Sequence, residues 1–173
     1  MRIVAGKFAG RHLTPPADDR VRPTAEPVRA ALLDLLAADL PDARVLDLFA
    51  GTGALGLEAL SRGARLADFV EFRPGSLHAL RANVAALRLR ERTRIFKRDA
   101  VPFAAALEED AYDLAFADPP YESTVLDRVL EIWRERRFAK VLAVEHACGH
   151  SLSGRGERHN FGDSAVSIFR RRG

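Results

Sequence analysis

Short apolar runs alternate with helical stretches along most of the chain. The apolar runs cover 44–49, 66–72, 93–98, 113–117 and 140–146, and helical stretches separate them at 54–62, 75–88, 100–108 and 124–137. An apolar run of this length is typical of a buried strand, and its alternation with helices is typical of βαβ units. The pattern therefore predicts a doubly wound α/β fold, in which helices cover both faces of a mostly parallel sheet.

Both ends of the chain depart from this alternation. Residues 25–38 place apolar side chains at helical spacing and predict a further helix ahead of the first strand. Near the C-terminus, strand-like pieces at 157–161 and 164–169 are joined by a tight connection, so one late strand is expected to run antiparallel. Residues 1–16 predict a small N-terminal β-hairpin. We therefore expect a hairpin extension over 1–16 and one α/β domain over 17–173.

Composition excludes several classes of protein. The chain has 173 residues, of which 47% are hydrophobic and 29% charged, as expected for one folded domain with a sizeable core. No apolar run reaches the roughly 20 residues that a membrane helix needs, and the N-terminal apolar stretch is too short for a signal peptide. The single cysteine, Cys148, excludes an intramolecular disulfide and fits a reducing compartment. We therefore expect a cytoplasmic protein, and a monomer by default.

The positive charge is unevenly distributed. The net charge is only +3, but residues 1–14 carry Arg2, Lys7, Arg11 and His12 with no acid, and nearly all the basic residues are arginine. Guanidinium groups bind phosphate through two parallel hydrogen bonds. For the chain as a whole, genomic base composition or heat adaptation explains the arginine bias equally well. For the N-terminal cluster we expect phosphate contact.

A glycine-rich turn follows the first predicted strand of the sheet. Gly51, Gly53 and Gly56 fit the G-x-G-x-x-G fingerprint of dinucleotide-binding folds, and Glu71 follows about 20 residues later, so NAD is a real alternative. However, Asp47 lies near the end of the strand, just before the turn, where a carboxylate would repel a pyrophosphate. A carboxylate at that place can instead receive the ammonium group of a methionine moiety, directly or through water.

The same segment matches the pattern D-x-F-x-G-x-G at every defined position and so resembles S-adenosylmethionine-binding enzymes. The residues of this segment that we expect to bind the cofactor are Asp47, Phe49, Gly51, Thr52 and Gly53. Glu71 closes the second predicted strand, where a carboxylate can accept both hydroxyls of a ribose. In similar enzymes the acid after the third strand accepts the adenine amino group, which here is Asp99, with the backbone of Ala100 beside the ring. Asp99 is also a good N-cap for the helix that follows.

The sharpest motif is Asp118-Pro119-Pro120-Tyr121, directly after the fourth predicted strand. The amino group of guanine or adenine is a poor nucleophile because its lone pair is delocalised into the ring. The Asp118 carboxylate and the Pro119 carbonyl can accept both N–H groups, so that the lone pair points at a sulfonium methyl group. Tyr121 offers an aromatic face on which an extruded base can stack. Neither a metal ion nor a covalent nucleophile is needed.

With both motifs in place, the whole chain resembles the bacterial 16S rRNA guanine-N2 methyltransferases of the RsmD type. The segments that carry the resemblance are Arg2–Gly6 with Gly10-Arg11, Arg22-Pro23-Thr24 followed by Val28-Arg29, Asp47–Gly63, and Asp118–Tyr121. The resemblance implies a Rossmann-like class I methyltransferase sheet and transfer of a methyl group from S-adenosylmethionine to one guanine of 16S rRNA, within an assembled or assembling small subunit, with S-adenosylhomocysteine as product. It also implies that Arg22 and Thr24 lie over the methionine end of the cofactor.

Several points stay open at this level. Thr24 is also a plausible N-cap for the first helix. The N-terminal extension is expected to contact RNA through Arg2, Lys7 and Arg11, although it could instead cover an edge of the sheet. The four-residue motif also serves adenine-N6 methylation of RNA or DNA, which is the close alternative function. An NAD-dependent oxidoreductase would need a hydride-transfer site that the sequence does not supply, and a non-catalytic RNA-binding factor is the last alternative.

Overall fold

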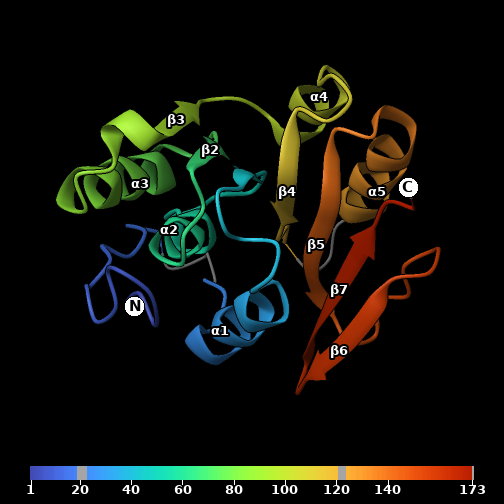
Figure 1. Cartoon of the computed structure of the whole chain (residues 1–173), viewed down its shortest axis with the longest axis horizontal. Coiled ribbons are helices and arrows are strands. Elements are labelled where there is room, and N and C mark those ends of the chain that lie inside the picture. The colour runs from blue at the N-terminus through green and yellow to red at the C-terminus, as the bar shows by residue number, and fades with distance from the viewer. Residues whose placement is uncertain (19–22, 121–123, 173) are drawn as a thin grey trace.

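The computed structural model describes residues 1–18, 23–120 and 124–172. Its elements alternate as the sequence predicts (Figure 1). The helices are α1 (Glu26–Leu35), α2 (Ala54–Ser61), α3 (Pro74–Ala86), α4 (Ala100–Ala105) and α5 (Val125–Arg136), with a short 3₁₀ turn at Arg90–Arg92. The strands are β1 (Arg44–Asp47), β2 (Leu66–Val70), β3 (Thr93–Phe96), β4 (Tyr112–Ala117), β5 (Ala139–Ala147), β6 (Glu157–Phe161) and β7 (Ser164–Arg170).

The strands form one sheet in the order β3-β2-β1-β4-β5-β7-β6. The first five in this order pair in parallel, while β7 pairs antiparallel with both β5 and β6. The predicted mostly parallel sheet with an antiparallel late strand is therefore confirmed. The strand order reverses between β1 and β4, and at such a point a doubly wound sheet leaves a crevice at the carboxyl ends of its strands.

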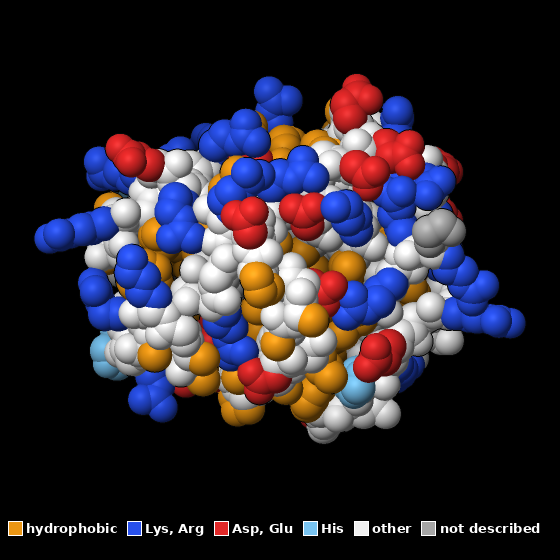
Figure 2. Space-filling model, in the orientation of Figure 1, with side chains coloured by type: hydrophobic (Ala, Val, Ile, Leu, Met, Phe, Trp, Pro, Cys, Tyr) orange, Lys and Arg blue, Asp and Glu red, His pale blue; other side chains and the backbone are white. Residues whose placement is uncertain are grey.

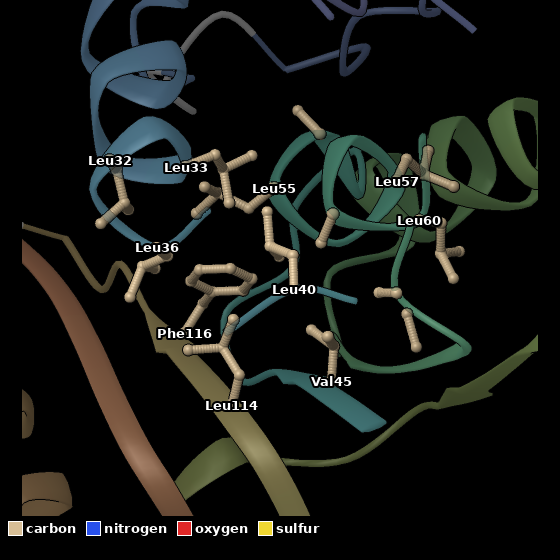
Figure 3. Packing of buried hydrophobic residues seen from close by; sticks show 14 of the residues in the cluster. Leu32, Leu33, Leu36, Leu40, Val45, Leu55, Leu57, Leu60, Leu114 and Phe116 are labelled. Carbon is tan, nitrogen blue, oxygen red and sulfur yellow. The ribbon is translucent and has the colours of Figure 1, made fainter. Parts of the chain in front are cut away.

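Helices cover both faces of the sheet (Figure 1). On one face, α1, α2 and α3 bury apolar side chains against β1 and β4, and Figure 3 shows leucines of α1 and α2 around Phe116 and Leu114 of β4. On the other face, α4 and α5 pack against alternate residues of the same strands, such as Leu46 and Ala115. Successive strand residues point to opposite faces, so one short strand contributes to both cores. Among the described residues, no helix is long and apolar enough to span a membrane.

A buried ion pair fixes the N-terminal segment to this framework. Arg29 of α1 and Glu58 of α2 are both fully buried, with 2.8 Å between Nε and Oε2. The other oxygen of Glu58 accepts hydrogen bonds from the backbone N–H groups of Val4 and Ala5. Arg29 donates a further hydrogen bond to the carbonyl oxygen of Arg2. The pair therefore joins the start of the chain to both α1 and α2.

The predicted N-terminal β-hairpin over 1–16 is wrong. The segment folds back on itself, but it has only one isolated antiparallel bridge, between Arg2 and His12, and no strands. The reason is that several of its backbone N–H groups donate to α2 instead of to the opposite half of the segment. The N–H groups of residues 4 and 5 bond to Glu58, and those of residues 7 and 8 bond to Ser61, which leaves few donors for a ladder. The segment is a strap across α2 rather than a hairpin.

Candidate active site

A cavity of about 290 Å³ opens at the carboxyl ends of β1, β2, β4 and β5. Its volume is close to the lower end of ordinary small-molecule sites, roughly 300–1,000 Å³. It lies where the strand order reverses, the usual ligand position in doubly wound sheets. The lining residues used below come from six segments of the chain: Thr24, Asp47, Phe49, Gly51, Thr52, Glu71, Phe72, Arg98, Ala100, Asp118, Pro119 and Glu145.

The glycine turn forms one wall of this cavity. Gly51 and Thr52 line it, and a side chain on Gly51 would meet no atom within 4 Å, so the space above its backbone is open. Gly53 is the N-cap of α2 with φ of +83°, a conformation that favours glycine. A Cβ on Gly56 would lie 2.4 Å from the ring of Phe69. The first glycine therefore leaves room for a ligand, whereas the other two allow the turn and the packing of α2 on β2.

Two carboxylates hold the ends of β1 and β2 in place. Asp47 is 1% exposed, and its Oδ2 accepts a hydrogen bond of 3.1 Å from the N–H of Gly56. Burial raises the pKa of Asp47 to about 7, the Gly56 hydrogen bond opposes this rise, and the negative charge of Glu71 adds to it. Glu71 accepts three backbone hydrogen bonds of 2.9 Å, one of them from Gly51. A carboxylate accepts about four hydrogen bonds, so one acceptor position of Glu71 remains for a ligand.

The Asp118-Pro119 step lies across the cavity from the glycine turn, directly after β4. The hydroxyl of Thr24 donates a hydrogen bond to Oδ2 of Asp118, which fixes the orientation of the carboxylate. The alternative role of Thr24 as an N-cap is wrong, because Ala25 occupies the N-cap position of α1. Burial and then the charge of Glu145 raise the pKa of Asp118 well above its usual value, and the Thr24 hydrogen bond lowers it in part. The motif thus presents a carboxylate with raised proton affinity to the cavity.

The sequence analysis did not single out Glu145, which also lines the cavity and is 4% exposed. Ala117 of β4 is in register with Val144 of β5, so Asp118 and Glu145 follow side by side on neighbouring parallel strands. The signal was present in the sequence, because an acidic residue near the end of an apolar run is the same feature that identified Asp47 and Glu71. Within the run 140–146, however, the surrounding apolar residues predict only a buried strand.

The end of β3 contributes differently from the prediction. Asp99 caps α4, since its Oδ1 accepts a hydrogen bond of 3.3 Å from the N–H of Val101, as its alternative role predicts. Its neighbours Arg98 and Ala100 line the cavity described above. Phe72, another residue that the sequence analysis missed, is 53% exposed at the rim, directly after Glu71. An exposed phenyl ring beside a ligand cavity offers a flat face for stacking.

Other predicted residues lie outside this cavity or outside the described part of the chain. Arg22 and Tyr121 belong to the residues that the structure does not describe. Arg2 pairs with Glu26 on α1, and a guanidinium nitrogen of Arg11 donates to a carbonyl oxygen at the end of α3. Lys7 lies over the ring of Phe8. On the face of the molecule that Figure 2 draws, Lys and Arg side chains are spread over the surface rather than gathered in one patch.

Comparisons with known proteins agree with this architecture. The family model described as "Conserved hypothetical protein 95" matches residues 1–150. "Putative rRNA methyltransferase YlbH" of Bacillus subtilis is 30% identical over the full length of both chains. "Ribosomal RNA small subunit methyltransferase D" of Escherichia coli is 36% identical over 76% of this chain and 66% of its own length.

Solved structures show the same fold. A hypothetical protein of Thermus thermophilus superimposes with a TM-score of 0.84 at 30% identity, covering 99% of both chains. A 16S rRNA N2 methyltransferase of the same organism, solved with AdoMet and guanosine, has a TM-score of 0.69 over 86% of this chain and 44% of its own, and at 19% identity the likeness concerns the fold alone. The chain therefore belongs to the Conserved hypothetical protein 95 family, that of the RsmD-type methyltransferases, as its sequence motifs predict.

Proposed function

We propose that this chain is an S-adenosylmethionine-dependent rRNA methyltransferase that modifies the N2 amino group of one guanine in 16S rRNA. The observation that carries the proposal is the position of the Asp118-Pro119 step, with its carboxylate oriented by Thr24, in the same cavity as the glycine turn. The family membership and the rRNA methyltransferase names of its relatives support the substrate class. We expect the enzyme to act as a monomer in the cytoplasm, on the small ribosomal subunit.

The residues that line the cavity offer contacts for the methionine, ribose and adenine parts of S-adenosylmethionine. The buried carboxylate of Asp47 would receive the ammonium group of the methionine moiety, next to the open space over Gly51. The remaining acceptor position of Glu71 would take a ribose hydroxyl. Phe72 and Ala100 offer apolar contact for the adenine, beside Phe49. The cofactor contacts predicted for Gly53 and Asp99 are less direct, because neither lines this cavity. Bound there, the cofactor supplies an electrophilic methyl group on a positively charged sulfur.

The chain's own contribution to the reaction is positioning. Asp118 and Pro119 would accept one hydrogen bond each from the amino group of the base, which draws its lone pair out of conjugation with the ring. The methylated nitrogen carries a positive charge, and the nearby carboxylate stabilises this charge. The raised pKa of Asp118 also suits it to receive the proton that the nitrogen then loses. Arg2, Lys7 and Arg11 would contact the RNA backbone from the N-terminal strap, and Tyr121 would stack on the extruded base.

Methylation of small subunits that lack the modification tests the proposal. The purified chain and S-adenosylmethionine are incubated with such subunits, and the rRNA is digested to nucleosides for mass analysis. We expect N2-methylguanosine, and a loss of about 100- to 1,000-fold in rate for Asp118→Ala. Asp113→Asn, which alters a carboxylate paired with Arg44 and Lys140 away from the cavity, is the matched control. Formation of N6-methyladenosine, or an unchanged rate for Asp118→Ala, would contradict the proposal.

A further inference from the structure

We propose that Glu145 selects guanine over other purines, by accepting a hydrogen bond from N1–H of the base whose N2 amino group Asp118 and Pro119 hold. This inference rests on the proposed function and assigns the base specificity of the same site. Glu145 lies outside the sequence motifs from which the family is recognised.

The sheet places Glu145 beside Asp118. The register between Ala117 and Val144 puts the next residues of the two parallel strands side by side, and neighbouring strands lie about 4.8 Å apart. Val144 packs on the α4–α5 face, so Glu145, the next residue of β5, points to the opposite face. Asp118, directly after β4, accepts a hydrogen bond from Thr24 just before α1. Both side chains line the cavity. The two carboxylates would therefore face a base held in this cavity.

The electrostatics agree with this placement. The negative charge of Glu145 is, after burial, the largest cause of the raised pKa of Asp118, as expected for two carboxylates that face one another closely. His146, the next residue of β5, points to the other face and makes a hydrogen bond of 2.8 Å with Ser167. Of these two neighbouring residues, therefore, only Glu145 points into the cavity.

The chemistry of the purines decides what such a pair recognises. On its Watson–Crick edge guanine presents two neighbouring donors, N1–H and the N2 amino group. Adenine presents its amino group beside N1, which is an acceptor. A carboxylate that is ionised only accepts hydrogen bonds, so Glu145 in this form complements N1–H of guanine and repels the N1 lone pair of adenine. A site built to bind a substrate N–H group discriminates strongly against an analogue without it.

The test uses 2-aminopurine, which keeps the 2-amino group but has a lone pair at N1. Small subunits are reconstituted around 16S rRNA that carries either guanine or 2-aminopurine at the nucleotide that the wild-type chain methylates. Single-turnover rates are measured for the wild type, Glu145→Gln and Glu145→Ala. Glu157→Gln on β6 is the control, because it makes the same change at an exposed glutamate paired with His159. Titration with S-adenosylhomocysteine checks that each variant keeps its fold and its cofactor site.

We expect the wild type and Glu157→Gln to prefer guanine by at least about 100-fold. Glu145→Gln should narrow this preference to within about 10-fold, because its amide can turn an N–H donor toward N1 of 2-aminopurine. Glu145→Ala should slow the reaction with guanine, and it should gain less activity on 2-aminopurine than Glu145→Gln, because it removes the repulsion of the N1 lone pair without supplying a donor. An unchanged preference in Glu145→Gln, with normal S-adenosylhomocysteine affinity, would overturn this inference alone. A wild-type product other than N2-methylguanosine would overturn the proposed function and this inference with it.

Discussion

Replacing Asp47 with asparagine should change how the stability of the protein depends on pH. The carboxylate is buried at the end of β1, and burial raises its pKa from 3.8 to about 7. The folded state therefore holds a proton that the unfolded state releases. This contribution to stability is complete below pH 3.8, and it is lost as the pH rises through about 7. The full loss is about 4 kcal/mol, at 1.36 kcal/mol for each unit of pKa shift.

Urea denaturation of the wild type and Asp47→Asn between pH 5 and pH 8 measures this effect. Over that range the free energy of unfolding of the wild type should fall by about 2.5 kcal/mol relative to the variant. Titrating groups that do not interact with Asp47 cancel in this difference, whereas the pKa of Asp118, which the charge of Asp47 helps to raise, is somewhat lower in the variant. His146, whose pKa burial lowers, contributes the opposite slope to both proteins, and Asp113, with a pKa lowered to about 2, titrates below the range. Parallel curves for the two proteins would refute the reasoning, because they would mean that Asp47 is ionised in both states.

Two of the three further predictions concern the same site, and the third concerns the buried ion pair of Arg29 and Glu58. S-adenosylhomocysteine should bind the wild type about 10-fold more weakly for each pH unit below 7, because its ammonium group needs an ionised Asp47, and calorimetry of Asp47→Asn should show no such dependence. Thr24→Val removes a hydrogen bond that lowers the pKa of Asp118, so the acid limb of the pH–rate profile should move to higher pH; a shift to lower pH would contradict this. Arg29→Met should cost about 3 kcal/mol in urea denaturation, because it removes the fully buried partner of Glu58 and leaves that carboxylate only its contact with Arg62, and a cost below about 1 kcal/mol would contradict the assigned role of the pair.

The sequence predicts most of the fold because the strands are short, buried and bounded by turn residues. Its boundaries are less accurate at the site itself. The apolar run 44–49 continues past the strand, which ends at Asp47, because the chain leaves the sheet there to form the glycine turn. The run 93–98 likewise ends as a strand at Phe96. Leu48 is still fully buried after the chain has left β1, so hydrophobicity there marks burial and not the end of the strand.

The candidate site was predictable where a motif and a strand end coincide. Asp47, Glu71 and Asp118 were found in this way, and the structure brings all three to one cavity. Glu145 was missed because its importance depends on the register of β5 against β4, which is a long-range property of the sheet. The N-terminal hairpin failed for a related reason. Its backbone donors bond to side chains about 55 residues away in the sequence, a competition that local turn signals do not reveal.

A crystal structure of this chain with S-adenosylhomocysteine tests the central claim most directly. We expect the amino-acid end of the ligand at Asp47 and its ribose at Glu71. Its sulfur should face the Asp118-Pro119 step, across a gap that admits one methyl group and one amino nitrogen. Reacting atoms in such a complex lie about 3–3.5 Å apart. A ligand whose sulfur faces away from Asp118, or one bound elsewhere with the glycine turn empty, would contradict the account.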